Sequence, residues 1–344
     1  MTDDSWRLPP EWEPQAAVLI AWPHSGTDWA ERLAAVETTY VALSAAVVRF
    51  QPLVVVVADG ELQRHVTDVL EQVHVNLERV RFVRLPYDDT WLRDSGPITL
   101  RSAVGTFQIT DFRFTGWGGK FGAEQDDALV AGLTGAGVFG QATHKRIDWA
   151  LEGGGIESDG AGSVLTTWRC LVQRHPEQSR EEMSAILRDS LHASRILWLD
   201  HGYLEGDDTD AHIDTLARFA PGDSIVFQAC SDASDRHYDE LQRMAAELAA
   251  LRTTDGRPYR LHPLPWPQPI LDRGRRLAAS YANYLVINGA VLVPAYGDLT
   301  DAEAARIIGV AHPGREVVQV PCRPLIWQNG SLHCITMQLL TAIG

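Results

Sequence analysis

Short apolar runs alternate along this chain with longer stretches in which apolar residues recur at every third or fourth position. The runs at 16–22 and 53–57 are dominated by Val, Leu and Ala and are typical of buried strands. Between them the apolar residues keep helical spacing, so we predict a helix that Asp28 caps and that continues to Phe50. The chain therefore opens with a strand, a helix and a second strand.

The same alternation continues towards the C-terminus. We predict further strands at 80–85, 98–100, 106–112, 163–167, 195–199, 224–229, 259–264 and 316–320. We predict helices at 61–73, 179–191 and 235–251 and from Thr300 onward, with capping boxes at Ser179/Glu182 and Thr300/Glu303. A hairpin over 283–294 turns at Asn288-Gly289. No linker interrupts the pattern, so we expect one closed α/β domain over residues 1–344, built from repeated small units of strands plus one helix.

Composition narrows the range of partners. The formal net charge of −15 argues against nucleic acid or an anionic membrane as the main partner, and it suits a cationic ligand. No apolar run approaches the length of a membrane span, and residues 1–6 lack the pattern of a signal peptide. The cysteines are scattered, without the spacing of a zinc site or a disulfide framework. We therefore expect a cytoplasmic protein.

Two segments place polar or aromatic side chains where strands end. The segment 88–97 reads Asp-Asp-Thr-Trp-Leu-Arg-Asp-Ser-Gly-Pro, and such an acidic cluster is either a capped turn or a ligand site. The segment 114–121 combines aromatic residues with glycines, as pocket walls often do. Its alternative is a tight turn that Trp117 holds in place.

Two later segments add acids and a histidine. Glu152 precedes three glycines, which let backbone approach a ligand closely; the spacing is not that of a nucleotide-binding loop. In the second, we predict an extended segment in which His212 and Asp214 share one face. The nearby acids Asp207, Asp208 and Asp210 are expected to form a solvated loop, and no metal-binding pattern accompanies the histidine.

A cysteine near the C-terminus is the candidate nucleophile. Cys334 follows the turn-forming residues 328–330 and precedes an apolar run, so its thiol can be both held and reached. Without a partner that lowers its pKa, it would be a small buried hydrophobe, as most free cysteines are. We expect the neighbouring His333 to point away from the thiol and to be structural. Cys170, Cys230 and Cys322 have no such motif beside them and are expected in the core.

The candidates together indicate one kind of chemistry. They lie at strand ends or turns far apart in the sequence: Asp94, Glu152, His212, Asp214 and Cys334. A thiol and an imidazole would be sufficient for amide hydrolysis, and several added carboxylates would hinder it. Carboxylates are useful when the electrophile is itself a cation with many N–H donors, and a guanidinium is such a group.

Four motifs at these positions resemble the signatures of the agmatine deiminases, in the bacterial-type peptidyl-arginine deiminase family of the guanidine-modifying (pentein) superfamily. They are residues 88–97, 152–154, 212–214 and 333–336, and the resemblance extends in order over nearly the whole chain. It implies a propeller of five pseudo-repeated α/β units around a central site. It also implies hydrolysis of agmatine to N-carbamoylputrescine and ammonia, with neither cofactor nor metal, in a homodimer.

The resemblance also assigns roles. Cys334 would attack the guanidinium carbon and form an amidino-cysteine intermediate, while Asp94 and Asp214 hold the nitrogens. His212 would protonate the departing ammonia and then activate water. Glu152 would orient His212, and the substrate would contact Trp91 and Trp117.

Two positions depart from the family pattern. A glycine-rich run commonly precedes the His-Cys pair, where this chain has Gln-Asn-Gly-Ser at 328–331, and Ala211 stands where a glycine often precedes the histidine. Both shape the pocket wall, so they bear on the substrate tail. The alternatives are a deiminase of arginine or peptidyl-arginine, an amidinotransferase, and a non-catalytic polyamine-binding or guanidine-binding protein.

Overall fold

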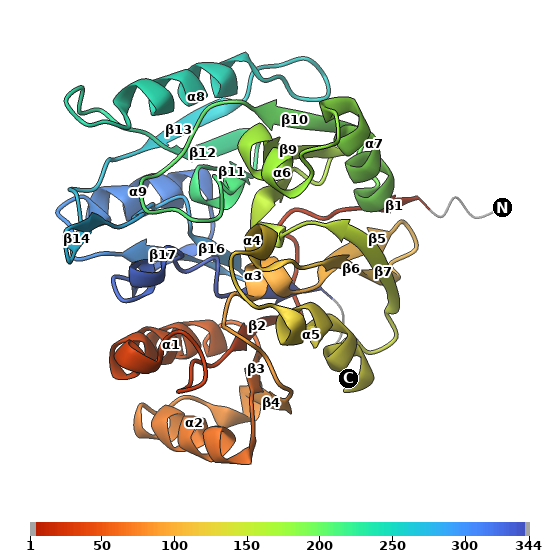
Figure 1. The fold of residues 1–344 in the computed structure, drawn as a ribbon, viewed down its shortest axis with the longest axis vertical. Coiled ribbons are helices and arrows are strands. Elements are labelled where there is room, and N and C mark those ends of the chain that lie inside the picture. The colour runs from red at the N-terminus through yellow and green to blue at the C-terminus, as the bar shows by residue number, and fades with distance from the viewer. Residues whose placement is uncertain (1–4, 341–344) are drawn as a thin grey trace.

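The computed structural model describes residues 5–340 of the chain, and Figure 1 shows their arrangement. The sequence-based expectation for residues 1–6 lies mostly outside this range. The described strands fall into six sheets, five of which have three or four strands. The strands are β1 Trp6–Arg7, β2 Ala17–Ala21, β3 Leu53–Val57, β4 Val80–Arg84, β5 Ile98–Ser102, β6 Phe107–Arg113, β7 Thr143–Ala150, β8 Ile156–Ser158, β9 Ser163–Thr167, β10 Arg195–Leu199, β11 Ala217–Ala220, β12 Ser224–Gln228, β13 Arg260–Leu264, β14 Leu271–Asp272, β15 Arg275–Arg276, β16 Leu285–Ile287, β17 Ala290–Ala295, β18 Glu316–Pro321 and β19 Met337–Leu339.

The five larger sheets share one plan. In each, a central strand pairs antiparallel with one neighbour and parallel with the other. A helix connects the two parallel strands, as a parallel crossover requires. The triplets, written as antiparallel neighbour, centre and parallel neighbour, are β19-β2-β3, β5-β6-β7, β8-β9-β10, β11-β12-β13 and β16-β17-β18.

In Figure 1 the longer crossover helices α1, α2, α7 and α8 lie towards the outside of the molecule, whereas the short helices α3, α4 and α6 lie nearer its middle. The α-helices are α1 Leu33–Val48, α2 Gly60–Gln72, α3 Leu92–Ser95, α4 Gly116–Gly119, α5 Glu124–Gly135, α6 Trp168–Arg174, α7 Arg180–Leu191, α8 Tyr238–Ala250 and α9 Asp301–Ala311. Among the described helices, none is long and apolar enough to cross a bilayer.

One sheet contains strands from both the N-terminal and the C-terminal part of the described chain. Strand β19, from the C-terminal segment, pairs antiparallel with β2, so Met337 lies opposite Leu19. Because β2 then pairs with β3, a single sheet contains the first and last strands of the repeated plan. This closure places the segment before β19, which carries Cys334, beside segments from the N-terminal third of the chain.

The structure confirms most of the predicted elements. Strands β9 and β10 have the predicted bounds, the 283–294 hairpin turns at Asn288-Gly289, and Ser179 and Glu182 form the capping box of α7. Helix α5 and strand β7 were not predicted. Strand β7 has no continuous apolar run, because most of its residues are polar and exposed.

Two predicted caps are wrong. Helix α1 is preceded by a 3₁₀ turn, and Asp28 does not cap it. Thr300 also makes no capping bond with its side chain; instead Asp301 accepts hydrogen bonds from the backbone N–H groups of Tyr296 and Gly297. In both places a local loop offers the backbone a competing set of hydrogen bonds.

A network of buried charges lies at the middle of the fold. The Arg218 guanidinium on β11 is almost wholly buried and binds Glu11 at 2.7 Å and Glu157 on β8. Its Nη1 donates to the Tyr284 carbonyl at 2.7 Å. Three sequence-distant segments therefore meet on one cation.

We predict that Arg218→Met destabilises the protein by about 3–5 kcal/mol, because it leaves two buried carboxylates without their cation. Urea unfolding measures the change. The matched control is Arg257→Met, which removes an exposed arginine that also binds two acids, and should alter stability little. Equal effects of the two substitutions would contradict the prediction.

Candidate active site

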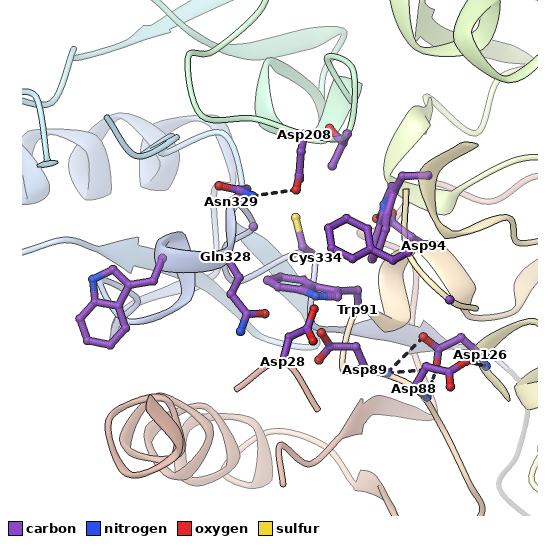
Figure 2. A pocket seen from close by; sticks show the side chains of 16 residues that line it. Asp28, Asp88, Asp89, Trp91, Asp94, Asp126, Asp208, Gln328, Asn329 and Cys334 are labelled. Carbon is purple, nitrogen blue, oxygen red and sulfur yellow. Dashed lines mark hydrogen bonds between the residues drawn. The ribbon is translucent and has the colours of Figure 1, made fainter. Parts of the chain in front are cut away.

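A cavity of about 410 Å³ opens at the middle of the fold, and Cys334 forms part of its wall (Figure 2). Its walls are acidic and aromatic, and none of the residues that line it is a lysine or an arginine. The lining includes the acids Asp28, Asp88, Asp89, Asp94, Asp126 and Asp208 and the aromatic residues Trp91, Trp117, Phe121 and Trp327. Such a cavity favours a cationic ligand.

Asn283 fixes the thiol of Cys334 in the cavity wall. Its side-chain Nδ2 donates to Sγ of Cys334 at 3.2 Å, and its Oδ1 accepts the backbone N–H of His333 at 2.9 Å. The backbone carbonyl of Cys334 accepts the N–H of Arg93, at the start of α3, at 3.1 Å. The nucleophile is thus attached to the element that carries Asp94. Sequence reasoning did not identify Asn283, which it placed only in a hairpin.

Asp94 is held by a glycine and a tryptophan. Its Oδ1 accepts the backbone N–H of Gly154 at 3.1 Å, and its Oδ2 accepts Nε1 of Trp117 at 2.9 Å. Trp117 has a left-handed backbone conformation, with φ of 57°. Segments 88–97 and 114–121 therefore both contribute residues to the cavity. Trp117 lines the cavity and also lies in a tight turn, so both interpretations of its segment are correct.

His212 lies between two carboxylates. Its Nδ1 is 3.5 Å from Oδ1 of Asp94, and its Nε2 is 3.4 Å from Oε2 of Glu152. The Nε of Arg174 on α6 donates to the other oxygen of Glu152 at 2.8 Å.

The predicted extended segment at His212 and Asp214 is wrong, because a 3₁₀ turn over Ile213–Thr215 directly follows His212.

Asp214 lies close to both the thiol of Cys334 and the ring of His333. Its Oδ2 lies 3.8 Å from Sγ of Cys334 and 2.8 Å from Nδ1 of His333. Its other oxygen is buried without a hydrogen-bond partner among the described residues, as is Nδ1 of His212. Because an unsatisfied buried polar atom is costly, these two atoms indicate a ligand that carries hydrogen-bonding groups.

These contacts set the protonation states. Burial raises the pKa of the Cys334 thiol well above its usual value, and the charges of Asp214 and Asp94 add to the increase. Burial also raises the pKa of Asp94, to about 6. For His212, burial lowers the pKa, but Asp94, Cys170 and Glu152 together outweigh it and raise the pKa well above its usual value. At neutral pH, Cys334 is therefore a thiol and His212 an imidazolium.

Cys170 lies in the core, as predicted, and its thiol is 3.9 Å from Oε2 of Glu152. The prediction for the loop acids is wrong. The loop acids are not merely solvated. Asp207 accepts the N–H of Ala211, Asp210 binds Arg174 at 2.7 Å, and Asp208 lines the cavity.

Ala211 has φ of 69°, in the left-handed region that favours glycine, which gives a physical reason why the family often has glycine there. The sequence could not show that Arg174 and Asp207 fold this loop, because each acts through a tertiary contact.

Two buried triads bring metal-ligating atoms within 4.8 Å of one another: Glu152, Cys170 and His212, and Glu11, Glu157 and His333. In the first, Arg174 already binds Glu152, and in the second, Arg218 binds both glutamates. A metal ion would compete with a guanidinium in each triad. These groups satisfy one another without an ion.

Comparison with known proteins places the chain in a family. The profile of the Porphyromonas-type peptidyl-arginine deiminases matches residues 7–339. The agmatine deiminase of Stutzerimonas stutzeri is 32% identical, over 97% of this chain and 95% of that protein. Among solved structures, a C. jejuni agmatine deiminase with substrate bound superposes with a TM-score of 0.91 at 32% identity, over 100% and 99% of the two chains.

Another solved structure is more similar in sequence. A chain from Porphyromonas gingivalis, provisionally named an arginine deiminase, is 45% identical, with a TM-score of 0.92 over 98% of this chain and 99% of its own. The α/β fold and a cysteine at the reactive centre define a hydrolase that acts on the carbon–nitrogen bonds of amidines. More specifically, the chain belongs to the Porphyromonas-type peptidyl-arginine deiminase family.

We predict that Gly154→Ala lowers kcat/KM at least about 100-fold, the size expected when reacting groups move by about 1 Å. A Cβ at this position would lie 2.7 Å from both Oδ1 of Asp94 and Nδ1 of His212, so both must move. Gly155→Ala is the control, because its Cβ would meet its nearest atom, Sγ of Cys170, at 3.6 Å. Steady-state ammonia release measures both, and equal activities would contradict the prediction.

Proposed function

We propose that this enzyme hydrolyses agmatine to N-carbamoylputrescine and ammonia through a covalent intermediate on Cys334. The single observation that carries the proposal is the cavity, which joins a thiol flanked by carboxylates to further acids and contains no cation in its lining. Agmatine has a guanidinium at one end and an ammonium at the other. Relatives named agmatine deiminases support the same reading.

The first half of the reaction forms a C–S bond. The guanidinium lies between Asp94 and Asp214, whose oxygens accept its N–H groups. The bound cation offsets the two carboxylate charges, and so it lowers the pKa of the Cys334 thiol, which releases its proton to solvent. The thiolate attacks the guanidinium carbon, and His212 gives its proton to the departing nitrogen, which leaves as ammonia.

The second half breaks the C–S bond. His212, now neutral, accepts a proton from a water molecule, whose oxygen attacks the amidino carbon. The thiolate of Cys334 leaves and takes up the hydroxyl proton of the product, so the thiol is restored and the neutral ureido product is released. Glu152 orients His212 in both halves of the reaction, because Arg174 binds the glutamate oxygen that does not face the histidine.

The far end of the cavity suits the ammonium of agmatine. Figure 2 shows Asp28 and Asp89 on the other side of Trp91 from the Cys334 sulfur. Burial raises the pKa of Asp89 to about 7, and the nearby charge of Asp28 adds to the increase. A bound ammonium would relieve this repulsion, while the butyl chain packs along Trp91. The carboxylate of arginine would face these acids without a cation to bind it.

Arginine or peptidyl-arginine is the second candidate, since the family takes its name from peptidyl-arginine deiminases and one 45% identical chain is provisionally named for arginine. Ammonia release from agmatine, arginine and an arginine peptide separates the two. Faster turnover of either alternative would overturn the choice of agmatine. Binding of putrescine-like amines, with no guanidine turned over, would instead indicate a binding protein.

The finer architecture is part of the same proposal. We propose that residues 1–344 form a single catalytic domain, a five-bladed α/β propeller whose blades are the five similar sheets. The five triplets of strands support it. So does the position of the site residues, because Asp94, Glu152, Asp214, Asn283 and Cys334 each lie a few residues before the antiparallel strand of a different triplet. The homodimer and the cytoplasmic location stay predictions, which sedimentation and cell fractionation test.

We predict that Cys334→Ala abolishes ammonia release while agmatine binding stays measurable by calorimetry, because the carboxylates that hold the guanidinium remain. Cys230→Ala is the control, since its thiol contacts the Asp232 carbonyl and does not line the cavity. Residual turnover by Cys334→Ala would show that another group is the nucleophile.

We predict that Asp89→Asn lowers kcat/KM for agmatine about 10- to 100-fold, the loss of one charge-assisted contact with the ammonium. Pentylguanidine, in which a methyl group replaces the amine, is the control substrate, and its kcat/KM should change little. Similar losses with both substrates would place the ammonium elsewhere.

A further inference from the structure

A chain of hydrogen bonds leads from Asp214 away from the cavity to the N-terminal segment. Nδ1 of His333 faces Oδ2 of Asp214 at 2.8 Å, and Nε2 faces Oε2 of Glu11 at 2.6 Å. An ionised carboxylate can only accept, so the ring donates from both nitrogens when both acids are ionised, and it then carries a positive charge. We call these three residues the Glu11–His333–Asp214 chain.

Glu11, at one end of the Glu11–His333–Asp214 chain, makes two further hydrogen bonds. Glu11 also accepts Nη2 of Arg218 at 2.7 Å and the backbone N–H of Val286 at 2.7 Å. None of the three residues of this chain is among those that line the substrate cavity, but Oδ2 of Asp214 lies 3.8 Å from Sγ of Cys334. Asp214 is therefore the member of the chain through which Glu11 and His333 reach the reacting thiol.

The two carboxylates beside the thiol differ because of this chain. Burial raises the pKa of Asp214, but the hydrogen bond and charge of His333, with the charges of His212 and Arg218, outweigh it and lower the pKa. Asp94 has no cation behind it apart from His212, and burial raises its pKa to about 6.

The other charged or titratable groups around Asp214 are Cys334, 3.8 Å away, the neighbouring Asp94, and Arg93, whose guanidinium lies 3.7 Å from Glu11. Arg93 cannot replace the histidine, because no contact within 4.0 Å joins it to Asp214 among the described ion pairs.

We propose that Glu11 and His333 are positioning residues for the reaction, which keep Asp214 ionised and oriented so that it can accept N–H groups of the guanidinium. The proposal rests on the proposed function, since it needs a cationic substrate held between Asp94 and Asp214. It adds two residues on the side of Asp214 that faces away from the substrate.

The pH profile of kcat/KM from pH 5 to 9 tests the proposal with the variants Glu11→Gln and His333→Gln. Loss of the positive ring leaves burial to raise the pKa of Asp214, so Asp214 joins Asp94 in titrating on the acid limb, which should move up and become steeper. The activity deficit should be about 10- to 100-fold near pH 6, typical of losing a hydrogen-bond partner behind a ligand, and should shrink as the pH rises.

Asp111→Asn is the matched control. Asp111 on β6 is also a buried acid that binds a histidine and an arginine, with His144 at 2.8 Å and Arg146 at 2.7 Å, but it does not line the cavity. Its substitution should lower the melting temperature and leave the shape of the pH profile unchanged.

Profiles of Glu11→Gln and His333→Gln that superimpose on that of the wild type after scaling would overturn the proposal. One folded variant is sufficient, because the two substitutions break the chain on opposite sides of one hydrogen bond. Failure of both to fold would show a structural role alone and would also overturn it. If the wild type releases no ammonia from any guanidine, the proposed function fails instead, so the two failures are distinguishable.

Discussion

The structure depends on burying several carboxylates next to one thiol. Asp94, Asp214 and Glu152 are all almost wholly excluded from solvent, where like charges repel strongly and no water compensates them. Two of them have a buried nitrogen donor as a partner: the guanidinium of Arg174 for Glu152 and the imidazole of His333 for Asp214. Asp94 has the weakest compensation and a raised pKa. That imbalance leaves the site with unmatched negative charge for a cation to meet.

The repeated plan of the sheets explains how these groups come together. Each of the five triplets has an antiparallel strand, and the segment just before that strand contributes one polar residue. Four of these residues are the two aspartates, the glutamate and the cysteine that the resemblance named. The fifth is Asn283, whose amide holds the thiol and the backbone of the nucleophile segment. The fold therefore supplies equivalent positions, and their different side chains supply the chemistry.

Local signals in the sequence were sufficient where neighbouring residues decide the structure. The bounds of β9 and β10 follow from apolar runs, and the capping box of α7 follows from two residues three positions apart. Predictions failed where a distant group intervened. Asp28 lies beside Asp89 in the cavity wall instead of capping a helix. A solvated-looking loop at 207–210 is fixed by Arg174 from α6.

The sequence by itself determined the rhythm of strands and helices and the set of candidate reacting side chains, because periodicity and residue chemistry are local properties. Only the tertiary structure decided which charged side chains contact each other. Glu11 and His333 stand 322 positions apart and lie 2.6 Å from each other across one hydrogen bond. The strength of a buried charge interaction depends on separation in space, and separation along the chain does not specify it.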